Sequence, residues 1–354
     1  MTDELPLLGF GLPVSGSWAT PATMLRIAQR AEELDYSSLW TFQRVLYPAE
    51  GERDPSFDAL HNPSTRPVDD ASYRQVHDPV VPLAFVAGHT NRIRLGTATV
   101  CAPFIAPALL AKSMTSLDLM CGGRLTIGLG IGWLPQEYVA AGVPFSQRGA
   151  RMDEYLRCLH ALWTEDPVEF AGDFYTVPPS HTGLRCVQQP HPPVLLGGLA
   201  APALRRAGRL AEGWISSSRQ DLGQIARSVE LVREGAREAG RDPGAVQIIV
   251  RGLVDLLEDD AGGSQRRPLH GTREQVLDDL VRLREQGVTE VFFDLNFSPR
   301  VGSPDVNAAA ASAYAEHVLE ELAPANMTRS RERSDRPERN EPQPALIKRL
   351  RPSA

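Results

Sequence analysis

The alternation of extended and helical segments is the feature that most restricts the fold of this chain. Apolar runs of β type recur along residues 5–323, and a segment with the apolar spacing of an amphipathic helix follows each of them. A chain with this alternation forms a parallel sheet covered by helices. Eight such pairs can be counted, which is the number in a TIM (β/α)8 barrel.

The first pair illustrates the assignments. Residues 5–13 form the predicted strand, Thr20 is a suitable N-cap, and Pro21 fits the first turn of the helix that follows. The other predicted strands are residues 36–42, 92–100, the start of 124–138, 193–198, 213–218, 245–257 and 288–295. The other predicted helices are residues 78–90, 106–120, 148–163, 202–211, 221–240, 272–287 and 304–323.

The domain organisation follows from this count. We predict a single barrel over residues 1–324, with a long polar loop at 43–77 and an insertion at about 167–192 that contains a β-hairpin. Two doubly wound domains are the alternative, but no linker occurs near the middle of the chain. Residues 325–354 carry eight basic and four acidic side chains with almost no apolar periodicity, which predicts a disordered, Arg/Pro-rich tail.

Composition excludes several classes of function. The net charge of −7 gives no general attraction for nucleic acid or for an acidic membrane surface. The chain has no apolar run long enough to span a bilayer, and acidic residues occupy its first positions, so we expect a cytoplasmic protein. The four cysteines are widely spaced and predict neither a metal site nor a disulfide framework.

The glycine run in RLTIGLGIGWLPQEY, residues 124–138, suggests a nucleotide-binding loop at first sight. The Rossmann pattern G-x-G-x-x-G requires a glycine at position 133, where this chain has Trp133. The run is therefore the end of a barrel strand. Either a flat ring lies directly on the bare backbone of Gly130 and Gly132, or a tightly packed barrel interior requires small residues there.

Other candidates lie where predicted strands end, because the active sites of TIM barrels are at that face. Thr97 to Thr99 form a small-residue run before Cys101, and Gly197, Gly198 and Leu199 precede a helix whose N-terminus could bind phosphate. Arg148 and Arg151 lie one helical turn apart. Each feature has a structural alternative, such as a tight turn or a charged surface. Since no catalytic triad or paired carboxylates appear at the strand ends, a bound cofactor is the simpler source of chemistry.

Several motifs in this order resemble one family. They are AEELDYSSLWTFQR, RIRLGTATV, PALLAKSMTSLDLMCGGRLTIGLGIGWLPQEY, RGARMDEYL, PVLLGG and GTREQVLDDLVRLREQGV. Over residues 5–324 the chain resembles the bacterial-luciferase-like flavin-dependent oxidoreductases, and among them the actinobacterial enzymes that use coenzyme F420. The resemblance implies a TIM barrel of the bacterial-luciferase-like type with insertions.

The resemblance also implies a cofactor site at the carboxyl end of the barrel. In this family, a bulge with a non-prolyl cis peptide lies behind the isoalloxazine or deazaflavin ring. Alignment with the family places this peptide at Ala98–Thr99, and Cys101 follows two residues later. Gly130 and Gly132 then line the ring. The residues implied to hold the cofactor phosphate and its anionic tail are Gly197, Gly198, Leu199, Arg148 and Arg151.

Two departures from the family bear on the substrate. Many relatives have Asp-His after the strand-two tryptophan, whereas Gln43-Arg44 occurs here after Trp40-Thr41-Phe42. A glutamate of the sugar-phosphate dehydrogenase branch is replaced by Trp133. Trp40 and Trp133 thus suggest an apolar, aromatic substrate pocket, with Arg44 and His77 as candidates to polarise a carbonyl or enone.

The resulting expectation is an F420-dependent oxidoreductase that transfers hydride between the deazaflavin and a small organic substrate bearing a carbonyl, alcohol or activated C=C bond. An FMN-dependent luciferase-like monooxygenase, which needs a flavin reductase as partner, is the first alternative. A non-catalytic protein that binds flavin or F420 is the second, and a barrel lyase or hydrolase is disfavoured by the lack of a lysine or carboxylate at a strand end. The family resemblance also implies a homodimer.

Overall fold

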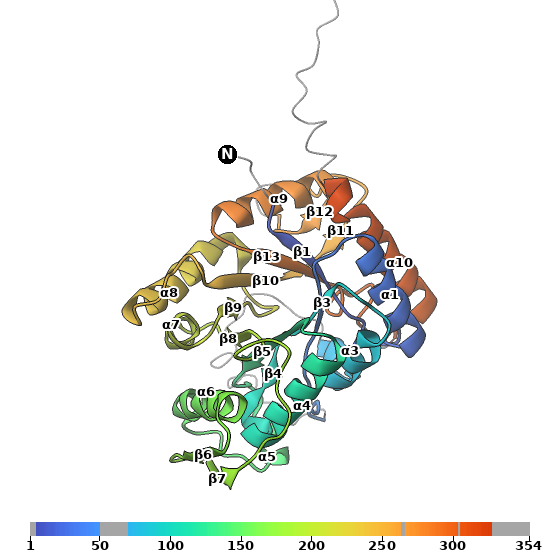
Figure 1. Cartoon of the computed structure of the whole chain (residues 1–354). Helices are drawn as coiled ribbons and strands as arrows, with labels where there is room; N and C mark the ends of the chain where they lie inside the picture. Colours follow the sequence, from blue (N-terminus) through green and yellow to red (C-terminus); the bar gives the residue numbers. More distant parts are fainter. Residues whose placement is uncertain (1–4, 50–69, 263–265, 304, 328–354) are drawn as a thin grey trace, which may run out of the picture.

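Eight parallel strands close into a barrel, which confirms the predicted TIM fold (Figure 1). The structure is a computed structural model and describes residues 5–49, 70–262, 266–303 and 305–327. Closure comes from pairing of β3 with β5. The barrel strands are β1 (Leu7–Gly11), β2 (Ser38–Thr41), β3 (Arg94–Thr97), β5 (Leu125–Gly130), β8 (Val194–Gly197), β9 (Gly213–Ile215), β10 (Gln247–Leu253) and β13 (Glu290–Asp294).

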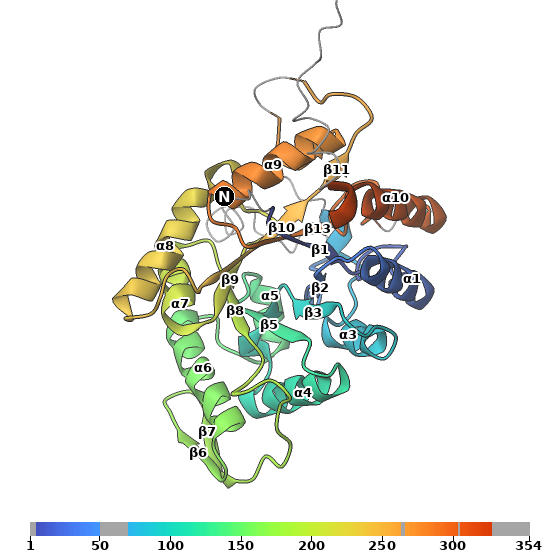
Figure 2. The same cartoon turned by 45° about the horizontal axis from the view of Figure 1, so that its top comes forward.

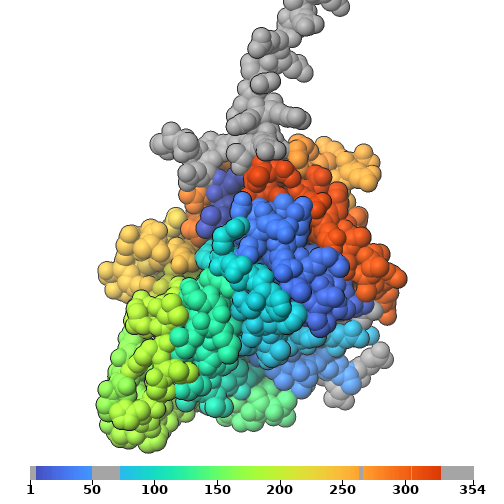
Figure 3. Space-filling model, turned by 45° about the vertical axis from the view of Figure 1, so that its right-hand side comes forward, coloured from blue at the N-terminus to red at the C-terminus, as the bar shows by residue number. Residues whose placement is uncertain are grey.

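Helices surround the strands on all sides (Figure 2). The first and last of them, α1 and α10, lie side by side at the seam of the chain (Figure 3), where Arg26 and Arg30 of α1 pair with Glu316 and Glu320 of α10. The surrounding helices are α1 (Pro21–Glu33), α3 (Val80–Ala87), α4 (Pro107–Met120), α6 (Arg148–Thr164), α7 (Ala201–Leu210), α8 (Ile225–Glu238), α9 (Arg273–Glu285) and α10 (Ala308–Glu321).

All eight predicted strand–helix pairs are present, and the differences are local. The third strand ends at Thr97 rather than at residue 100, because a cis peptide follows at Ala98–Thr99 and the chain then pairs with β5 as the short β4 (Val100–Cys101). Helix α5 (Pro135–Ala140) was not predicted from the sequence, since it has only six residues. The 3-10 turns η1 (Asp70–Tyr73), η2 (Ala102–Phe104) and η3 (Leu222–Gln224) complete the connections.

Two predicted segments fall largely outside the described residues. These are the central part of the long loop, residues 50–69, and the tail from residue 328 onward. The described chain continues beyond α10 to Met327, whose side chain is buried in the core. Within the described ranges, no helix combines the length and apolar character needed to cross a membrane.

A two-stranded antiparallel sheet, β6 (Val168–Ala171) and β7 (Thr176–Ser180), forms the hairpin predicted in the insertion. The hairpin projects beyond α6 (Figure 1), and Glu154 of that helix attaches it. The buried carboxylate of Glu154 accepts hydrogen bonds from the backbone N–H groups of Asp173, Phe174 and Tyr175 at 2.9, 2.7 and 2.7 Å. Burial acts to raise the pKa of Glu154, but these three donors outweigh it and the pKa lies below its usual value.

We expect Glu154→Gln to lower the free energy of unfolding by about 2 kcal/mol at pH 7, because an amide replaces a charged acceptor of several N–H donors. The folded-state pKa is lowered, so this contribution is present above the unfolded-state pKa of about 4.3 and is lost as pH falls through the folded-state value. Urea unfolding of the two proteins at neutral and acidic pH measures the effect. A difference that stays constant down to pH 3 would contradict this role for Glu154.

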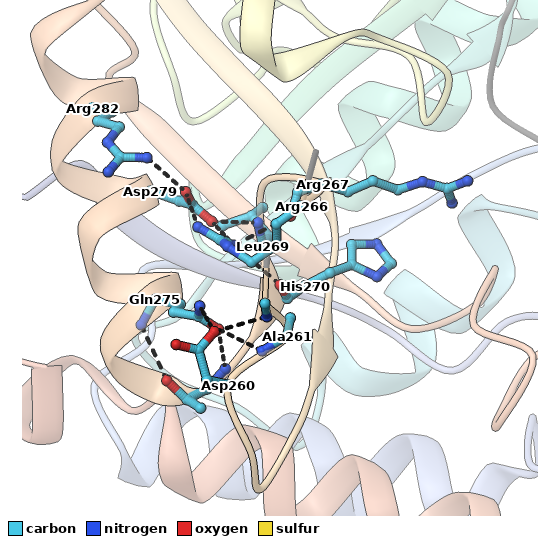
Figure 4. A network of polar contacts seen from close by, with 11 residues as sticks. Asp260, Ala261, Arg266, Arg267, Leu269, His270, Gln275, Asp279 and Arg282 are labelled. Atoms are coloured by element: carbon cyan, nitrogen blue, oxygen red, sulfur yellow. Dashed lines mark hydrogen bonds and ion pairs between the residues drawn. The ribbon is translucent and has the colours of Figure 1, made fainter. Parts of the chain in front are cut away.

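The connection from β10 to α9 is held by a second carboxylate. It contains the short strands β11 (Asp255–Leu256) and β12 (His270–Gly271), which pair in parallel. Asp279 of α9 accepts two hydrogen bonds from the guanidinium of Arg266 and one from the backbone N–H of Leu269 (Figure 4). The loop before α9 is thereby fixed to the helix that it precedes.

Candidate functional site

A cavity of about 500 Å³ opens at the carboxyl ends of the strands, the face where TIM barrels place their active sites. The loops that follow β2, β3, β5, β8 and β9 contribute to its wall. Most of the residues predicted for the cofactor and the substrate meet here. They are Arg44, Ala98, Thr99, Cys101, Gly130, Gly132, Trp133, Arg148, Gly197, Gly198 and Leu199.

Below the cavity, β3 and β5 come into close backbone contact. Thr97 Oγ1 both donates to the carbonyl of Gly128 and accepts from its N–H, each at 2.9 Å. A Cβ atom added at Gly128 would overlap the carbonyl oxygen of Thr97, and one added at Gly130 would lie 2.6 Å from Thr99 Oγ1. Gly128 therefore satisfies a packing constraint, whereas Gly130 and Gly132 also face the cavity. Packing accounts for Gly128 and also restricts Gly130 and Gly132, and the ring predicted at Gly130 and Gly132 stays a prediction.

The two glycines should respond differently to substitution. We expect Gly128→Ala to destabilise the fold by about 3 kcal/mol or more, because strand backbone must move to admit the methyl group. Gly130→Ala should cost less, since the contacting atom belongs to the Thr99 side chain, which can rotate. Thermal unfolding of both variants measures the difference, and equal losses of stability would show that β3 and β5 are not packed in this way.

The turn from β8 into α7 forms a second bare wall. Gly197 and Gly198 line the cavity without side chains, and the carbonyl of Gly198 accepts a hydrogen bond from Trp214 Nε1 at 3.0 Å. Ala200 is the N-cap of α7 and supplies no side-chain cap. In this first turn Pro202 has no N–H, and the N–H of Ala203 donates to the carbonyl of Ala200 at 2.8 Å, so the donors that an anion near the cavity could use are the N–H groups of Ala200 and Ala201.

Arg148 is the predicted cation that reaches this cavity. It lies at the start of α6, donates to the carbonyl of Gly132 at 2.9 Å and places its Cζ 3.8 Å from the ring centroid of Phe145. Cys101 lines the same region, and burial followed by the charge of Glu137 raises the pKa of its thiol well above the usual value. Cys101 is therefore a neutral thiol at physiological pH and contributes shape rather than nucleophilic chemistry.

Two buried guanidinium–carboxylate pairs lie in the wall of the cavity. Arg44, whose side chain is 9% exposed, donates to Glu137 of α5 at 3.0 Å, and that carboxylate also accepts from the N–H of Val45 at 2.7 Å. Arg251 of β10 donates to Asp294 of β13 at 2.5 Å and to the carbonyl of Ala98 at 3.2 Å. Its Cζ lies 4.6 and 4.5 Å from the ring centroids of Phe42 and Phe297.

Sequence reasoning missed several residues of the wall. Glu137 occurs one turn after Trp133 in a helix too short to be predicted, and Arg251 is a single charge inside an apolar strand, which signals a buried partner. The serines at the end of β9 follow the predicted strand GWISSS directly. The missed residues that line the cavity are Phe42, Gln43, Tyr73, Ile131, Glu137, Ala200, Ala203, Ile215, Ser216, Ser217, Ser218 and Arg251.

Trp40 was predicted for the substrate pocket and does not lie there. Its indole is buried inside the barrel, stacked on Phe292 at a centroid distance of 5.3 Å. Nε1 donates to Ser38 Oγ at 2.7 Å and to Glu290 Oε1 at 3.1 Å. The indole takes the space that a side chain at the neighbouring Gly96 would occupy. Because Trp40 points into the interior of the closed barrel, it fills the core.

His77 and Arg151 are also placed away from the cavity. The exposed His77 lies before α3, with Nε2 2.9 Å from the carbonyl oxygen of Ala19. Arg151 shares its helix with Arg148, but its Cζ lies 4.5 Å from the ring centroid of Phe174 in the β6–β7 connection. Phe174 of the insertion thus contacts Arg151. Although Arg148 and Arg151 lie one helical turn apart, only Arg148 reaches the cavity.

No cluster of three or more His, Cys, Asp or Glu side chains that could hold a metal ion occurs among residues 5–49, 70–262, 266–303 and 305–327. The carboxylates of the cavity wall are instead engaged by arginine. Within the described part of the chain, the cavity therefore offers bare backbone, aromatic rings and guanidinium groups.

Comparison with known proteins agrees with this geometry. The family described as luciferase-like monooxygenase matches residues 9–262. The chain is 35% identical over 255 residues to the protein Rv0953c of Mycobacterium tuberculosis, covering 72% of this chain and 79% of that one. It is 34% identical over 176 residues to an F420-dependent glucose-6-phosphate dehydrogenase of Gordonia bronchialis, covering 48% and 51%.

A solved structure shows the same fold. The monooxygenase RslO1 of Streptomyces bottropensis aligns with a TM-score of 0.70 at 23% identity, over 90% of this chain and 99% of that one. With a family match across most of the chain, the protein belongs to the luciferase-like monooxygenase family. This confirms the resemblance inferred from the sequence motifs.

Proposed function

We propose that this protein is an F420-dependent oxidoreductase that acts on a small organic substrate with a carbonyl, alcohol or activated C=C group. The observation that carries the proposal is the convergence of bare backbone from the ends of β5 and β8 on one cavity, next to the Ala98–Thr99 connection between β3 and β4. Its relatives include an F420-dependent dehydrogenase, which supports the choice of cofactor.

The cavity wall fits a flat ring with an anionic extension. Gly130 and Gly132 line one side of the cavity with backbone, and Gly197 and Gly198 line another. We propose that the ring lies between these two walls and that the phosphate lies at the N-terminus of α7, with Arg148 as a cation for the acidic tail. Bound F420 supplies hydride exchange with the substrate.

The side chains of this chain then position the reactants and exclude water. Arg251 holds the carbonyl of Ala98 and is itself held by Asp294, which keeps the proposed ring support in one conformation. Trp133 and Tyr73 provide apolar walls for the substrate. Such positioning accounts for much of the rate of a reaction between two bound partners. Turnover also requires a separate enzyme that renews the cofactor.

The phosphate position can be tested at Ala200, the N-cap of α7. Gly198 is unsuitable, because its φ of +156° favours glycine and an added Cβ would lie 2.6 Å from Ala203 Cβ. Ala200→Asp should keep or improve folding, since aspartate is a good N-cap, but its charge repels a bound phosphate. We expect the Kd for F420 to rise about tenfold or more at low salt.

Ala200→Asn is the matched control, because asparagine also caps a helix and carries no charge. Its Kd for F420, measured by quenching of tryptophan fluorescence, should stay within about threefold of wild type. Equal affinities in the aspartate and asparagine variants would place the phosphate elsewhere. Binding of FMN with none of F420 would replace the proposed function by that of an FMN-dependent monooxygenase.

A further inference from the structure

Arg44 has a hydrogen-bond donor that its surroundings leave unused. Its Nε is buried, and no acceptor for it is found among the described residues, although the side chain lines the cavity. A guanidinium does not lose its proton at physiological pH, so this N–H persists as a donor. Buried donors are rarely left without an acceptor, so this one in a cavity wall calls for an acceptor from outside the protein. An acceptor on a bound ligand would satisfy it.

One terminal nitrogen and the flat face of the Arg44 guanidinium are already engaged. The guanidinium is paired with Glu137 through one terminal nitrogen, and its Cζ lies 4.7 Å from the ring centroid of Tyr73 and 5.1 Å from that of Trp133. Both distances are within the range of cation–π attraction. These contacts hold the group in place, so the unused N–H has a defined position beside two aromatic walls of the cavity.

The pairing with Glu137 selects the charge of the ligand. Glu137 occupies one terminal nitrogen of Arg44 and neutralises the charge of the guanidinium. A second anion would also lie close to the Glu137 carboxylate, whose side chain is only 5% exposed. A buried N–H beside an ion pair that is already neutral matches an uncharged acceptor atom.

We propose that Arg44 Nε donates to the carbonyl oxygen of a neutral ketone or enone substrate whose planar, conjugated frame lies against Trp133 and Tyr73. The inference rests on the proposed function and narrows its substrate class to uncharged carbonyl compounds. Arg44 is then a substrate-binding residue that also polarises the C=O bond, and Glu137 is a positioning residue that discriminates against carboxylates.

The test compares three probes of one size: acetophenone, ethylbenzene and benzoate. Calorimetric titration into protein saturated with oxidised F420 should give a Kd for acetophenone about 10- to 100-fold lower than for ethylbenzene, the range expected for a hydrogen bond to a charged donor. Benzoate should bind more weakly than acetophenone. The infrared C=O stretch of carbonyl-¹³C acetophenone should shift to lower frequency on binding.

Two variants isolate the donor. Arg44→Met combined with Glu137→Gln removes the donor without leaving a lone buried charge, and it should abolish both the preference for acetophenone and the infrared shift. Glu137→Gln alone should strengthen benzoate binding, a gain that loss of structure would not produce. Arg219→Met is the matched control, because Arg219 Cζ lies 5.6 Å from the ring centroid of Trp133 but Arg219 does not line the cavity. It should leave the preference unchanged.

The outcomes separate this inference from the proposed function. No preference for acetophenone in the wild-type protein, or a preference that survives in the double variant, overturns the role of Arg44 while F420 binding stands. Benzoate binding that is as tight as acetophenone binding overturns the selection by Glu137. If neither F420 nor FMN binds in the preceding titration, the proposed function fails, and the probes are then compared in the protein without cofactor.

Discussion

The approach of β3 and β4 to β5 is the constraint on which the rest of the molecule depends. The barrel closes there, with Thr97 bonded to the backbone of Gly128. The strands meet there without an intervening side chain, and the residues that follow in each strand, Ala98, Thr99 and Gly130, line the cavity. Ala98–Thr99 is the connection between β3 and β4. Residues directly beyond the closure contact therefore shape the cavity.

A second level of organisation comes from the two buried ion pairs in the wall. Arg44 with Glu137 and Arg251 with Asp294 join loops and strands that are far apart in the sequence. An unpaired guanidinium or an unpaired carboxylate buried there would lower the stability of the fold, so each partner requires the other. Together they bring positive groups to the mouth of the barrel without making it strongly charged, which suits uncharged substrates beside an anionic cofactor.

The sequence predicted the strand–helix order well because hydrophobic periodicity and helix caps are local properties. Thr20 illustrates this, since its side chain caps α1 as expected. Part of the cavity lining was predicted, because glycines and small residues at the strand ends indicated where backbone lines the cavity. Glu137 and Asp294 were missed because only the closed barrel brings them to their arginines. Trp40 was wrongly assigned to the substrate pocket because the sequence does not show whether a strand residue points to the mouth or to the interior of the barrel. Arg151 was wrongly assigned to the cofactor site because an aromatic ring of the insertion binds it instead.

The central claim is that a flat cofactor ring lies on the bare backbone at the mouth of this barrel. A crystal structure of the protein grown with F420 tests it most directly. We predict density for the ring in van der Waals contact with Gly130 and the Ala98–Thr99 peptide, and for the phosphate at the N-terminus of α7. A ring bound at another face of the protein, or a mouth filled by side chains with F420 absent at saturating concentration, would contradict the account.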